Sequence, residues 1–218
     1  TAASLDGGIA LSDDQKRWLT GDSMRHFVHE LRSRCDVLLT GVGTILADDP
    51  ELTCRAPARN ADSPAVFVLD SQLRTPPTAR IFGVGNRPVT LLCKPSAPKD
   101  RLMALTQAGA VVTRLPAHPN GQLDLDAVLD YLGAGGINTL LVEAGTGVTT
   151  AMLAAGLVDK IYWTQSPHVL GADARPVVGP LKLVALPNQN LYTQLTSSQI
   201  GQDQLRVFVQ DINADHIG

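Results

Sequence analysis

Short runs of apolar residues, each followed by a turn and then by a helical pattern, constrain the fold of this chain most. The runs occupy residues 36–40, 65–69, 89–93, 111–113 and 139–143. They do not alternate polar and apolar residues, so they suit strands that are covered on both faces. Strands of this kind, separated by helices, are typical of a mostly parallel sheet. The spacing therefore predicts an α/β fold.

Apolar residues at helical spacing lie between these runs. The clearest helix is expected over residues 24–31, with Thr20 or Asp22 as its N-cap. Further helices are expected near 98–108, 124–133 and 148–156. From residue 159 the pattern changes, because 160–164 and 204–209 look like strands with no helix between them. Such strands are usually antiparallel. We expect a mostly parallel central sheet with flanking helices, ending in an antiparallel strand pair.

Charge and composition exclude several classes of function. The chain has 18 Lys+Arg against 21 Asp+Glu, and aromatic residues make up 4%. It therefore offers neither a sustained positive field nor stacking platforms to a nucleic acid. The cysteines, Cys35, Cys54 and Cys93, are odd in number and widely spaced, so we expect a reducing cytoplasm and no disulfide framework. No metal-ligand spacing and no apolar run near the ~18 residues of a membrane span are present.

The strongest local signal is the stretch 141–151, where a buried strand runs into a glycine-rich turn that opens a helix. Gly145 and Gly147 allow close approach of a ligand, and the helix start directs N–H donors at an anion. Position 150 is Thr, so the third glycine of a dinucleotide fingerprint is missing. A tight strand–helix turn without a ligand is the alternative. Glu143 favours a site, since it ends the strand where open α/β sheets bind ligands.

A second signal lies in 40–50, where another strand ends in glycines and Asp48 and Asp49 follow. A simple turn with Asx hydrogen bonds is the alternative. Arg55 lies beyond this stretch, and the first helix carries a stripe of Arg25, His29 and Arg32 that either borders a cleft or is solvated surface charge. Lys16 and Trp18 precede that helix.

The second predicted strand is followed by polar residues that could bind a cofactor. Asp70 could accept a hydrogen bond from a ribose hydroxyl, whereas Ser71 and Arg74 could hold a phosphate, and the sequence leaves this open.

Several of these stretches occur together in a known family. They are 3–7, 18–20, 43–53, 69–71, 142–145 and 170–174. In this order they resemble the reductase domain of the bifunctional riboflavin-biosynthesis deaminase/reductase, over nearly the whole chain. The resemblance implies a single reductase domain over 1–218, a fold similar to dihydrofolate reductase, and a cytoplasmic homodimer. It also implies reduction of 5-amino-6-(5-phosphoribosylamino)uracil to the ribitylamino compound with NADPH.

The resemblance also assigns roles to residues by motif position. Contacts to NADPH are expected from Ala2, Trp18, Thr44, Asp48, Ser71, Gly145, Thr146, Gly147, Val148, Thr149, Thr150 and Ala151. Contacts to the substrate are expected from Lys16, Arg32, Leu52, Arg55 and Glu143. Hydride would reach C1′ of the opened ribosylamine, with Asp48 as the candidate for handling the proton. Arg32, Arg55 and Lys16 would share the phosphate and ribose of the substrate.

The sequence departs from the family pattern in three places. Gly8 stands where the family usually has Lys or Arg, and the start of the first strand with its Lys is not among these residues. The zinc deaminase domain that usually precedes the reductase is also not among them, so no metal is expected here, although the chain could be fused to or act with such a domain. Two alternatives stay open: another NADPH-dependent reductase on the dihydrofolate-reductase fold, and a non-catalytic nucleotide-binding module.

Overall fold

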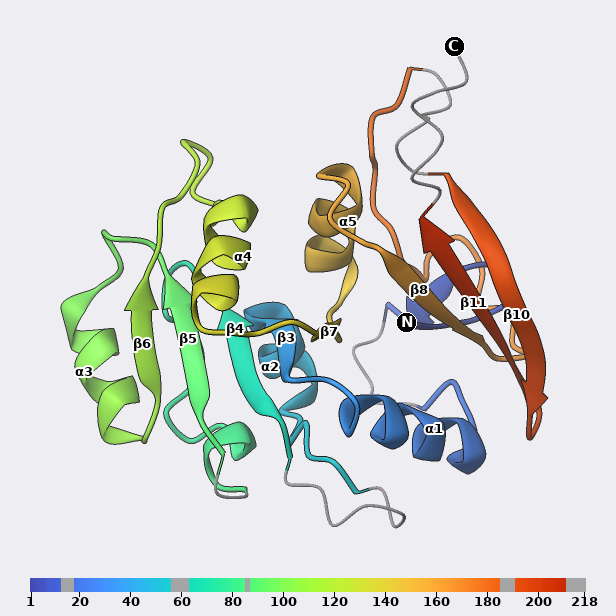
Figure 1. Ribbon diagram of the computed structural model, residues 1–218, viewed down its shortest axis with the longest axis horizontal. Helices are drawn as coiled ribbons and strands as arrows, with labels where there is room; N and C mark the ends of the chain where they lie inside the picture. Colours follow the sequence, from blue (N-terminus) through green and yellow to red (C-terminus); the bar gives the residue numbers. More distant parts are fainter. Residues whose placement is uncertain (13–17, 56–62, 85–86, 185–190, 211–218) are drawn as a thin grey trace. The chain divides into compact units, whose positions relative to one another are not determined.

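The computed structural model describes residues 1–12, 18–55, 63–84, 87–184 and 191–210 (Figure 1). The chain forms two compact units, one of His26–Ala144 and one of Thr1–Arg25 with Gly145–Gly218. The expectation of a single domain over 1–218 stays a prediction. Within the described residues, no helix is both long and apolar enough to cross a membrane.

The unit of residues 26–144 is built on a five-stranded parallel sheet. Its strand order is β6-β5-β4-β3-β7. The strands are β3 (Val37–Gly41), β4 (Ala65–Leu69), β5 (Val89–Cys93), β6 (Val111–Arg114) and β7 (Leu140–Val142). Every neighbouring pair in this sheet is parallel. Each apolar run of the sequence thus forms a strand, which confirms the α/β fold class and the mostly parallel sheet.

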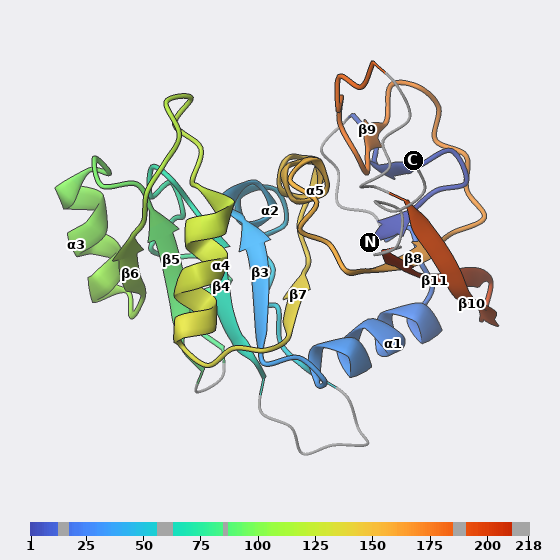
Figure 2. The same ribbon diagram turned by 45° about the horizontal axis from the view of Figure 1, so that its top comes forward.

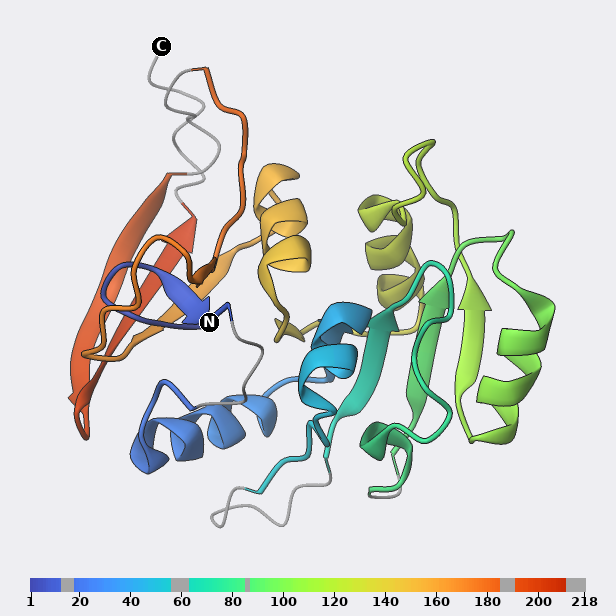
Figure 3. The ribbon, with the colours of Figure 1, turned by 180° about the vertical axis from the view of Figure 1, so that it is seen from behind.

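Both faces of this sheet are buried, which explains why its strands do not alternate polar and apolar residues. One face carries Leu38, Val66 and Leu91 in a cluster that includes residues of the helices α2 (Val42–Asp48) and α3 (Lys99–Gln107). The other face carries Leu39 and Phe67, packed with residues of α4 (Leu125–Ala134). Figure 2 shows α4 in front of the sheet, and Figure 3 shows α2 on the opposite face. The expected helices near 98–108 and 124–133 are confirmed.

Helix α2 was not expected from the sequence, which suggested only glycines and an Asp-Asp-Pro turn at this place. The helix follows β3 directly and buries Val42 and Ile45 against the sheet. Its C-cap is Asp49, a residue in the left-handed region with φ of 42°, whose N–H donates to the carbonyl of Ile45. Asparagine and aspartate tolerate this conformation better than other non-glycine residues. The left-handed conformation of Asp49 therefore ends α2 and changes the chain direction before residues 51–55. The short 3-10 helix η1 (Arg80–Phe82) lies between β4 and β5.

The unit that contains the two chain ends holds a mixed sheet of order β1-β8-β11-β10. Its strands are β1 (Ala2–Ala3), β8 (Lys160–Gln165), β10 (Tyr192–Ile200) and β11 (Asp203–Gln210). The predicted antiparallel pair is confirmed as β8 and β11. Strand β10, which pairs with β11 along its length, was missed because it is polar and mostly exposed. The helix expected at 148–156 is α5 (Thr146–Ala154), and α1 (Asp22–Arg32) crosses the boundary between the units.

Two of the family-like stretches meet in this unit. Strands β2 (Gly8–Ala10) and β9 (Arg175–Pro176) pair, and the turn before β2 is closed by the carboxylate of Asp6. That carboxylate accepts hydrogen bonds from the Ser4 hydroxyl at 2.5 Å and from the N–H groups of Leu170 at 3.1 Å and Gly171 at 2.7 Å. The Ser4 hydroxyl, followed by the N–H groups of Gly171 and Leu170, lowers the pKa of Asp6 to about 2.

We expect Asp6 to stabilise the fold in a pH-dependent way. Because the pKa in the folded chain lies below the ordinary value of 3.8, the stabilisation is present above about pH 4 and is lost as the pH falls toward about 2. The difference in unfolding free energy between wild type and Asp6→Asn should shrink over that range in urea titrations. Asp130→Asn on α4 is a charge-matched control. A carboxyl carbon of Asp6 that titrates near pH 4 by NMR would contradict the prediction.

Candidate active site

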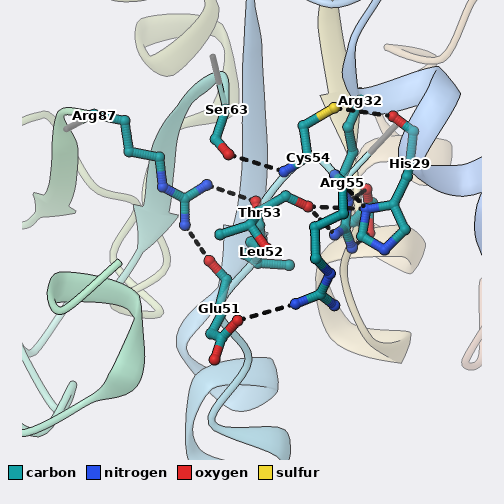
Figure 4. Close-up of polar contacts among 10 residues, drawn as sticks. His29, Arg32, Glu51, Leu52, Thr53, Cys54, Arg55, Ser63 and Arg87 are labelled. Carbon is teal, nitrogen blue, oxygen red and sulfur yellow. Dashed lines mark hydrogen bonds and ion pairs between the residues drawn. The ribbon is translucent and has the colours of Figure 1, made fainter. Parts of the chain in front are cut away.

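The residues predicted to bind substrate in the parallel-sheet unit centre on an ion pair between Arg32 and Glu143. Figure 4 shows Arg32 with its neighbours His29 and Thr53. Arg32 is the last residue of α1, and Glu143 follows β7 directly. The Nε and Nη2 atoms of Arg32 donate to the two carboxylate oxygens of Glu143 at 2.7 and 2.6 Å. The side chains are only 13% and 23% exposed, so the pair is shielded from solvent. Such fork-to-fork geometry fixes both groups in orientation.

A third element joins this pair through the backbone of Thr53. The Nη1 atom of Arg32 donates to the Thr53 carbonyl at 2.8 Å. Arg32 thus uses donors on all three of its nitrogens, although two of its five N–H groups stay available. The carboxylate of Glu143 has about four acceptor positions, and Arg32 takes two of them. The arrangement therefore presents remaining acceptor capacity on a fixed, partly buried carboxylate.

Residues 51–55, which we call the 51–55 segment, are held from the other side by Arg87. Its Nη1 donates to the Leu52 carbonyl at 2.5 Å, and its Nη2 donates to the Glu51 carbonyl. Leu52 has φ of 50°, a left-handed conformation that is strained for a branched residue. Its side chain is 5% exposed and belongs to the hydrophobic core. Core packing and Arg87 together keep the segment in this unusual conformation.

The side chain of Arg55 lies at the open end of the same segment. It is 65% exposed and pairs with the carboxylate of Glu51 at 3.1 Å. Glu51 also pairs with Arg80, whose backbone N–H donates to Asp49 at 2.9 Å. Two cations thus share one carboxylate at this point. Because an exposed ion pair is weak, Arg55 can turn to an anionic ligand at little cost.

His29 lies between Arg32 and Arg55, and its charge state matters to both. The Nδ1 atom is 3.0 Å from the Thr53 carbonyl and 3.2 Å from the backbone nitrogen of Arg55. One ring nitrogen cannot donate to the first and accept from the second, so the tautomer selects one contact. Burial, followed by the positive charges of Arg32 and Arg55, lowers the pKa of His29. When the imidazole is neutral, the positive charge of this region is carried by Arg32 and Arg55.

Cys54 and Ser63 complete the polar contacts of the segment. The Sγ atom of Cys54 donates to the His29 carbonyl at 3.3 Å, and the backbone N–H of Cys54 donates to the Ser63 hydroxyl at 2.9 Å. The 51–55 segment is therefore tied both to α1 and to the start of β4. Among the described residues, no group of three or more His, Cys, Asp or Glu could hold a metal ion.

Three residues predicted to contact NADPH lie in the same unit. Thr44 and Asp48 are four residues apart on α2, so they share one face of the helix. Asp48 is exposed and Thr44 is half-buried. Ser71 follows β4, and its carbonyl accepts a hydrogen bond from the N–H of Lys94 at 3.2 Å. Thr44 lies in the first turn of α2, directly after β3, and Ser71 lies just beyond β4, so these two residues adjoin the carboxyl ends of parallel strands, where open α/β sheets bind ligands.

The remaining predicted cofactor residues belong to the unit that holds the chain ends. Gly145 is the N-cap of α5, with an extended backbone. A Cβ added at Gly147 would meet no heavy atom of the described residues within 4 Å, so the first turn of α5 has open space beside it. The Thr146 hydroxyl donates to the Pro176 carbonyl, and the Thr150 hydroxyl accepts the N–H of Gly179 at 2.7 Å. The open space therefore lies beside Gly147, in the first turn of α5.

Of the other two residues, Ala2 lies in β1, and the indole of Trp18 is 79% exposed. The guanidinium carbon of Arg25 lies 5.0 Å from the centre of the Trp18 ring. This cation–π contact orients an otherwise exposed aromatic plane. Lys16, predicted to bind substrate, lies outside the described residues.

Sequence reasoning missed Arg87, Arg80, Glu51 and the role of His29. Arg87 is 35 residues from Leu52, and no local pattern marks a contact over that separation. The helical stripe that contains His29 and Arg32 was noted, but its partner Glu143 lies 111 residues from Arg32. The parallel register of β3 and β7 brings Glu143 next to Leu39. Only this register could have suggested that Glu143 lies close to Arg32.

Comparisons with known proteins identify the family of this chain. The family model described as the RibD C-terminal domain matches residues 1–206. The 2,5-diamino-6-ribosylamino-4(3H)-pyrimidinone 5′-phosphate reductase of Methanothermobacter thermautotrophicus is 36% identical over 179 residues, which are 81% of this chain and 80% of that protein. RibD of Escherichia coli is 35% identical over 190 residues, which are 79% of this chain and 48% of that protein.

Solved structures extend the comparison to the fold. RibD of Acinetobacter baumannii is similar with a TM-score of 0.80 and 27% identity, over 96% of this chain and 56% of that chain. The chain thus spans about half the length of these RibD proteins. The matched region includes the whole parallel sheet, the 51–55 segment and the Arg32–Glu143 pair. The chain therefore belongs to the RibD C-terminal domain family.

Proposed function

We propose that this chain reduces 5-amino-6-(5-phosphoribosylamino)uracil to 5-amino-6-(5-phosphoribitylamino)uracil with NADPH, as a step of riboflavin biosynthesis. The observation that carries the proposal is the fixed Glu143 carboxylate, held by Arg32, together with the exposed cation of Arg55, since both charges act on the same His29. A carboxylate accepts hydrogen bonds from the hydroxyl and amino groups of such a substrate, and an arginine binds its phosphate. A reductase activity also agrees with the name of the Methanothermobacter relative.

We assign different roles to the two arginines. Arg55 binds the substrate phosphate, since its side chain is 65% exposed and its ion pair with Glu51 is readily exchanged. Arg32 orients Glu143, because its fork is already engaged with that carboxylate. Glu143 then accepts hydrogen bonds from donor groups of the ribose or the pyrimidine. In this assignment Arg32 acts on substrate mainly through Glu143, rather than through the phosphate alone.

The residues present fit a phosphorylated dinucleotide. The open space beside Gly147, at the start of α5, admits a pyrophosphate next to backbone donors and the positive end of the helix dipole. The exposed ring of Trp18 offers a flat surface, and Ser71 offers a hydroxyl at the end of β4. When bound, NADPH would supply the hydride that reaches C1′ of the ribosylamine. Asp48, exposed at the end of α2, is our candidate for moving the accompanying proton.

A second substrate is favoured by the identity to the Methanothermobacter protein. That relative is named for a 2,5-diaminopyrimidinone phosphate, which carries an amino group where the uracil compound carries an oxo group. Both compounds offer the same phosphoribosylamino group to Arg55 and Glu143. Discrimination between them would depend on contacts to the exocyclic group of the pyrimidine ring.

Further parts of the proposal concern partners. We propose that the active form is a homodimer in the cytoplasm and that it works with a zinc deaminase, either fused to it or separate. The support for the deaminase partner is that several relatives are RibD proteins about twice as long as the matched region, and that one solved structure is titled as a deaminase/reductase.

A direct assay tests the proposed reaction. NADPH oxidation is followed by absorbance with the uracil substrate, the diaminopyrimidinone substrate and dihydrofolate in parallel, and the product is identified by mass. Turnover of either phosphoribosylamino compound, with none of dihydrofolate, is the expected result. Turnover of dihydrofolate alone would assign a different reductase. Tight NADPH binding without any turnover would indicate a non-catalytic nucleotide-binding module.

The two arginine roles predict different mutant phenotypes. Arg55→Met should lower kcat/KM for the phosphorylated substrate by roughly 30- to 1000-fold, about 2–4 kcal/mol, and should have little effect on a dephosphorylated analogue. Arg32→Met should impair both substrates, because Glu143 loses its orientation. Arg34→Met, which removes an exposed cation of the same stretch, is the matched control. Equal losses for Arg55→Met on both substrates would refute the phosphate assignment.

Arg87 should affect substrate binding without touching the substrate. Arg87→Met removes the donors to Glu51 and Leu52, so the strained Leu52 can relax and displace Arg55. We expect KM for substrate to rise about tenfold, ~1.4 kcal/mol, with little change in kcat or NADPH affinity. Arg87→Lys keeps a donor and should recover part of the loss, while Arg101→Met on α3 serves as control. A fall in kcat with unchanged KM would contradict a positioning role.

A further inference from the structure

Helix α5 has little core packing of its own to hold it in place. It contains nine residues, of which only Met152 is buried. An isolated helix of fewer than about 12 residues is marginal in water. The first turn of this helix is nevertheless the part at which the proposed function needs a fixed geometry, because the pyrophosphate of NADPH would bind there. The placement of that turn therefore depends largely on polar contacts.

Two threonines on one face of α5 make these contacts with residues 170–179, which we call the 170–179 segment. Thr146 and Thr150 are four residues apart, so they share a face of the helix. The Thr146 hydroxyl donates to the Pro176 carbonyl. The Thr150 hydroxyl donates to the Thr146 carbonyl at 2.6 Å and accepts the N–H of Gly179 at 2.7 Å. The threonine face of α5 is therefore tied to the segment.

Glycine at position 179 allows the segment to approach this face closely. A Cβ added at Gly179 would lie 3.3 Å from Oγ1 of Thr150 and 3.4 Å from Cγ2 of Thr146. At such distances the neighbouring atoms have to give way by a few tenths of an ångström. The hydrogen bond from Gly179 to Thr150 thus depends on the absence of a side chain at position 179.

The 170–179 segment is itself held by the turn before β2. The carboxylate of Asp6, in that turn, accepts the N–H groups of Leu170 at 3.1 Å and Gly171 at 2.7 Å. The N–H of Val177 donates to the Gly7 carbonyl at 2.9 Å, next to the paired strands β2 and β9. The turn thus anchors the segment both near its start and beside the residues that contact α5.

Gly8, at which the sequence departs from the family pattern, lies in this anchor. A Cβ added there would lie 3.0 Å from the Cβ of Ala174 and 3.1 Å from Cδ1 of Leu170. The glycine therefore lets the turn and the segment pack directly against each other. Close-packed groups transmit a displacement rather than absorb it. We therefore expect a change in the turn to reach the contacts between the segment and α5.

We propose that Thr150 is a positioning residue for the cofactor, and that Asp6 acts on the same site through the 170–179 segment. The inference rests on the proposed function, because it takes the pyrophosphate of NADPH to bind at the start of α5. Asp6 holds the segment, and the segment holds the threonine face of the helix. The first turn then presents Gly147 and the positive end of the helix dipole to the ligand. All these residues belong to the unit that holds the chain ends.

Equilibrium titrations with NADPH and with adenosine 2′-monophosphate test the role of Thr150 without turnover. Thr150→Val leaves the N–H of Gly179 without its acceptor and should raise the Kd of NADPH at least threefold. Thr150→Ser keeps the hydroxyl and should stay within twofold of wild type. Adenosine 2′-monophosphate has no pyrophosphate, so its Kd should change less than twofold in each variant. Thr193→Val, on an exposed position of β10, is the matched control and should bind NADPH like wild type.

A double-mutant cycle tests the link from Asp6. Asp6→Asn should also raise the Kd of NADPH at least threefold, because an amide cannot accept the same set of N–H groups as the carboxylate. Independent effects add in free energy, so their factors on Kd multiply. If Asp6 acts through the clamp, Asp6→Asn combined with Thr150→Val binds NADPH about as weakly as Thr150→Val alone. Factors that multiply overturn the role of Asp6.

A second variant keeps the test available if Thr150→Val does not fold. Gly179→Ala crowds the same contact from the segment side and should also raise the Kd of NADPH at least threefold. Thermal unfolding shows which variants are folded before they are titrated.

The outcomes separate this inference from the proposed reaction. A change in NADPH Kd below threefold in the folded variants of Thr150 and Gly179 overturns the inference, even if the enzyme reduces its substrate with NADPH. Equal losses for NADPH and adenosine 2′-monophosphate also overturn it, because the variants would then disturb the whole site. A loss confined to NADPH, with recovery in Thr150→Ser, supports the inference even if neither pyrimidine substrate is reduced. If the wild type does not bind NADPH, the cofactor assignment fails and the inference fails with it.

Discussion

The bidentate contact between Arg32 and Glu143 organises the candidate site. It joins the end of α1 to the end of β7, and the third nitrogen of Arg32 extends the contact to the backbone of Thr53. Three segments far apart in the sequence are thereby fixed by one guanidinium. Removing either partner would leave a partly buried charge without its counterion, which costs more than the pair itself contributes. His29, whose pKa is lowered by burial and by the neighbouring arginines, adds no competing charge.

The strands of the parallel sheet could be predicted because burial on both faces requires runs of consecutive apolar residues, which are easily recognised in the sequence. The runs at 65–69 and 89–93 coincide with β4 and β5. Strand β10 left no such signal, since an outer strand with Thr, Ser and Gln gains its stability from pairing with β11 rather than from burial. Helix α2 was missed because its glycine and its Asp-Asp-Pro end resemble a turn. The helix is stabilised by burial of Val42 and Ile45 against the sheet, and the local sequence does not indicate that burial.

The site itself was only partly predictable. Arg32, Glu143, Leu52 and Arg55 were singled out from motif position, and the structure brings Arg32 and Glu143 into contact. The sequence could not indicate how the 51–55 segment is held. Arg87 donates hydrogen bonds to backbone carbonyls, and every residue has a carbonyl, so no residue type marks the contact. For the same reason the burial of Asp70 was invisible, and its carboxylate could be mistaken for a ligand group.

The pairing of β1 with β8 has a consequence for how the chain assembles during synthesis. Ala2 is in register with Thr164, so β1 gains its partner strand only after β8 has been made. The unit of His26–Ala144, by contrast, is continuous in sequence and contains its complete parallel sheet. It can form as soon as β7 leaves the ribosome, whereas β1 still lacks the strand with which it pairs. Contacts at such large sequence separation form slowly, which makes closure of the mixed sheet a late event in folding.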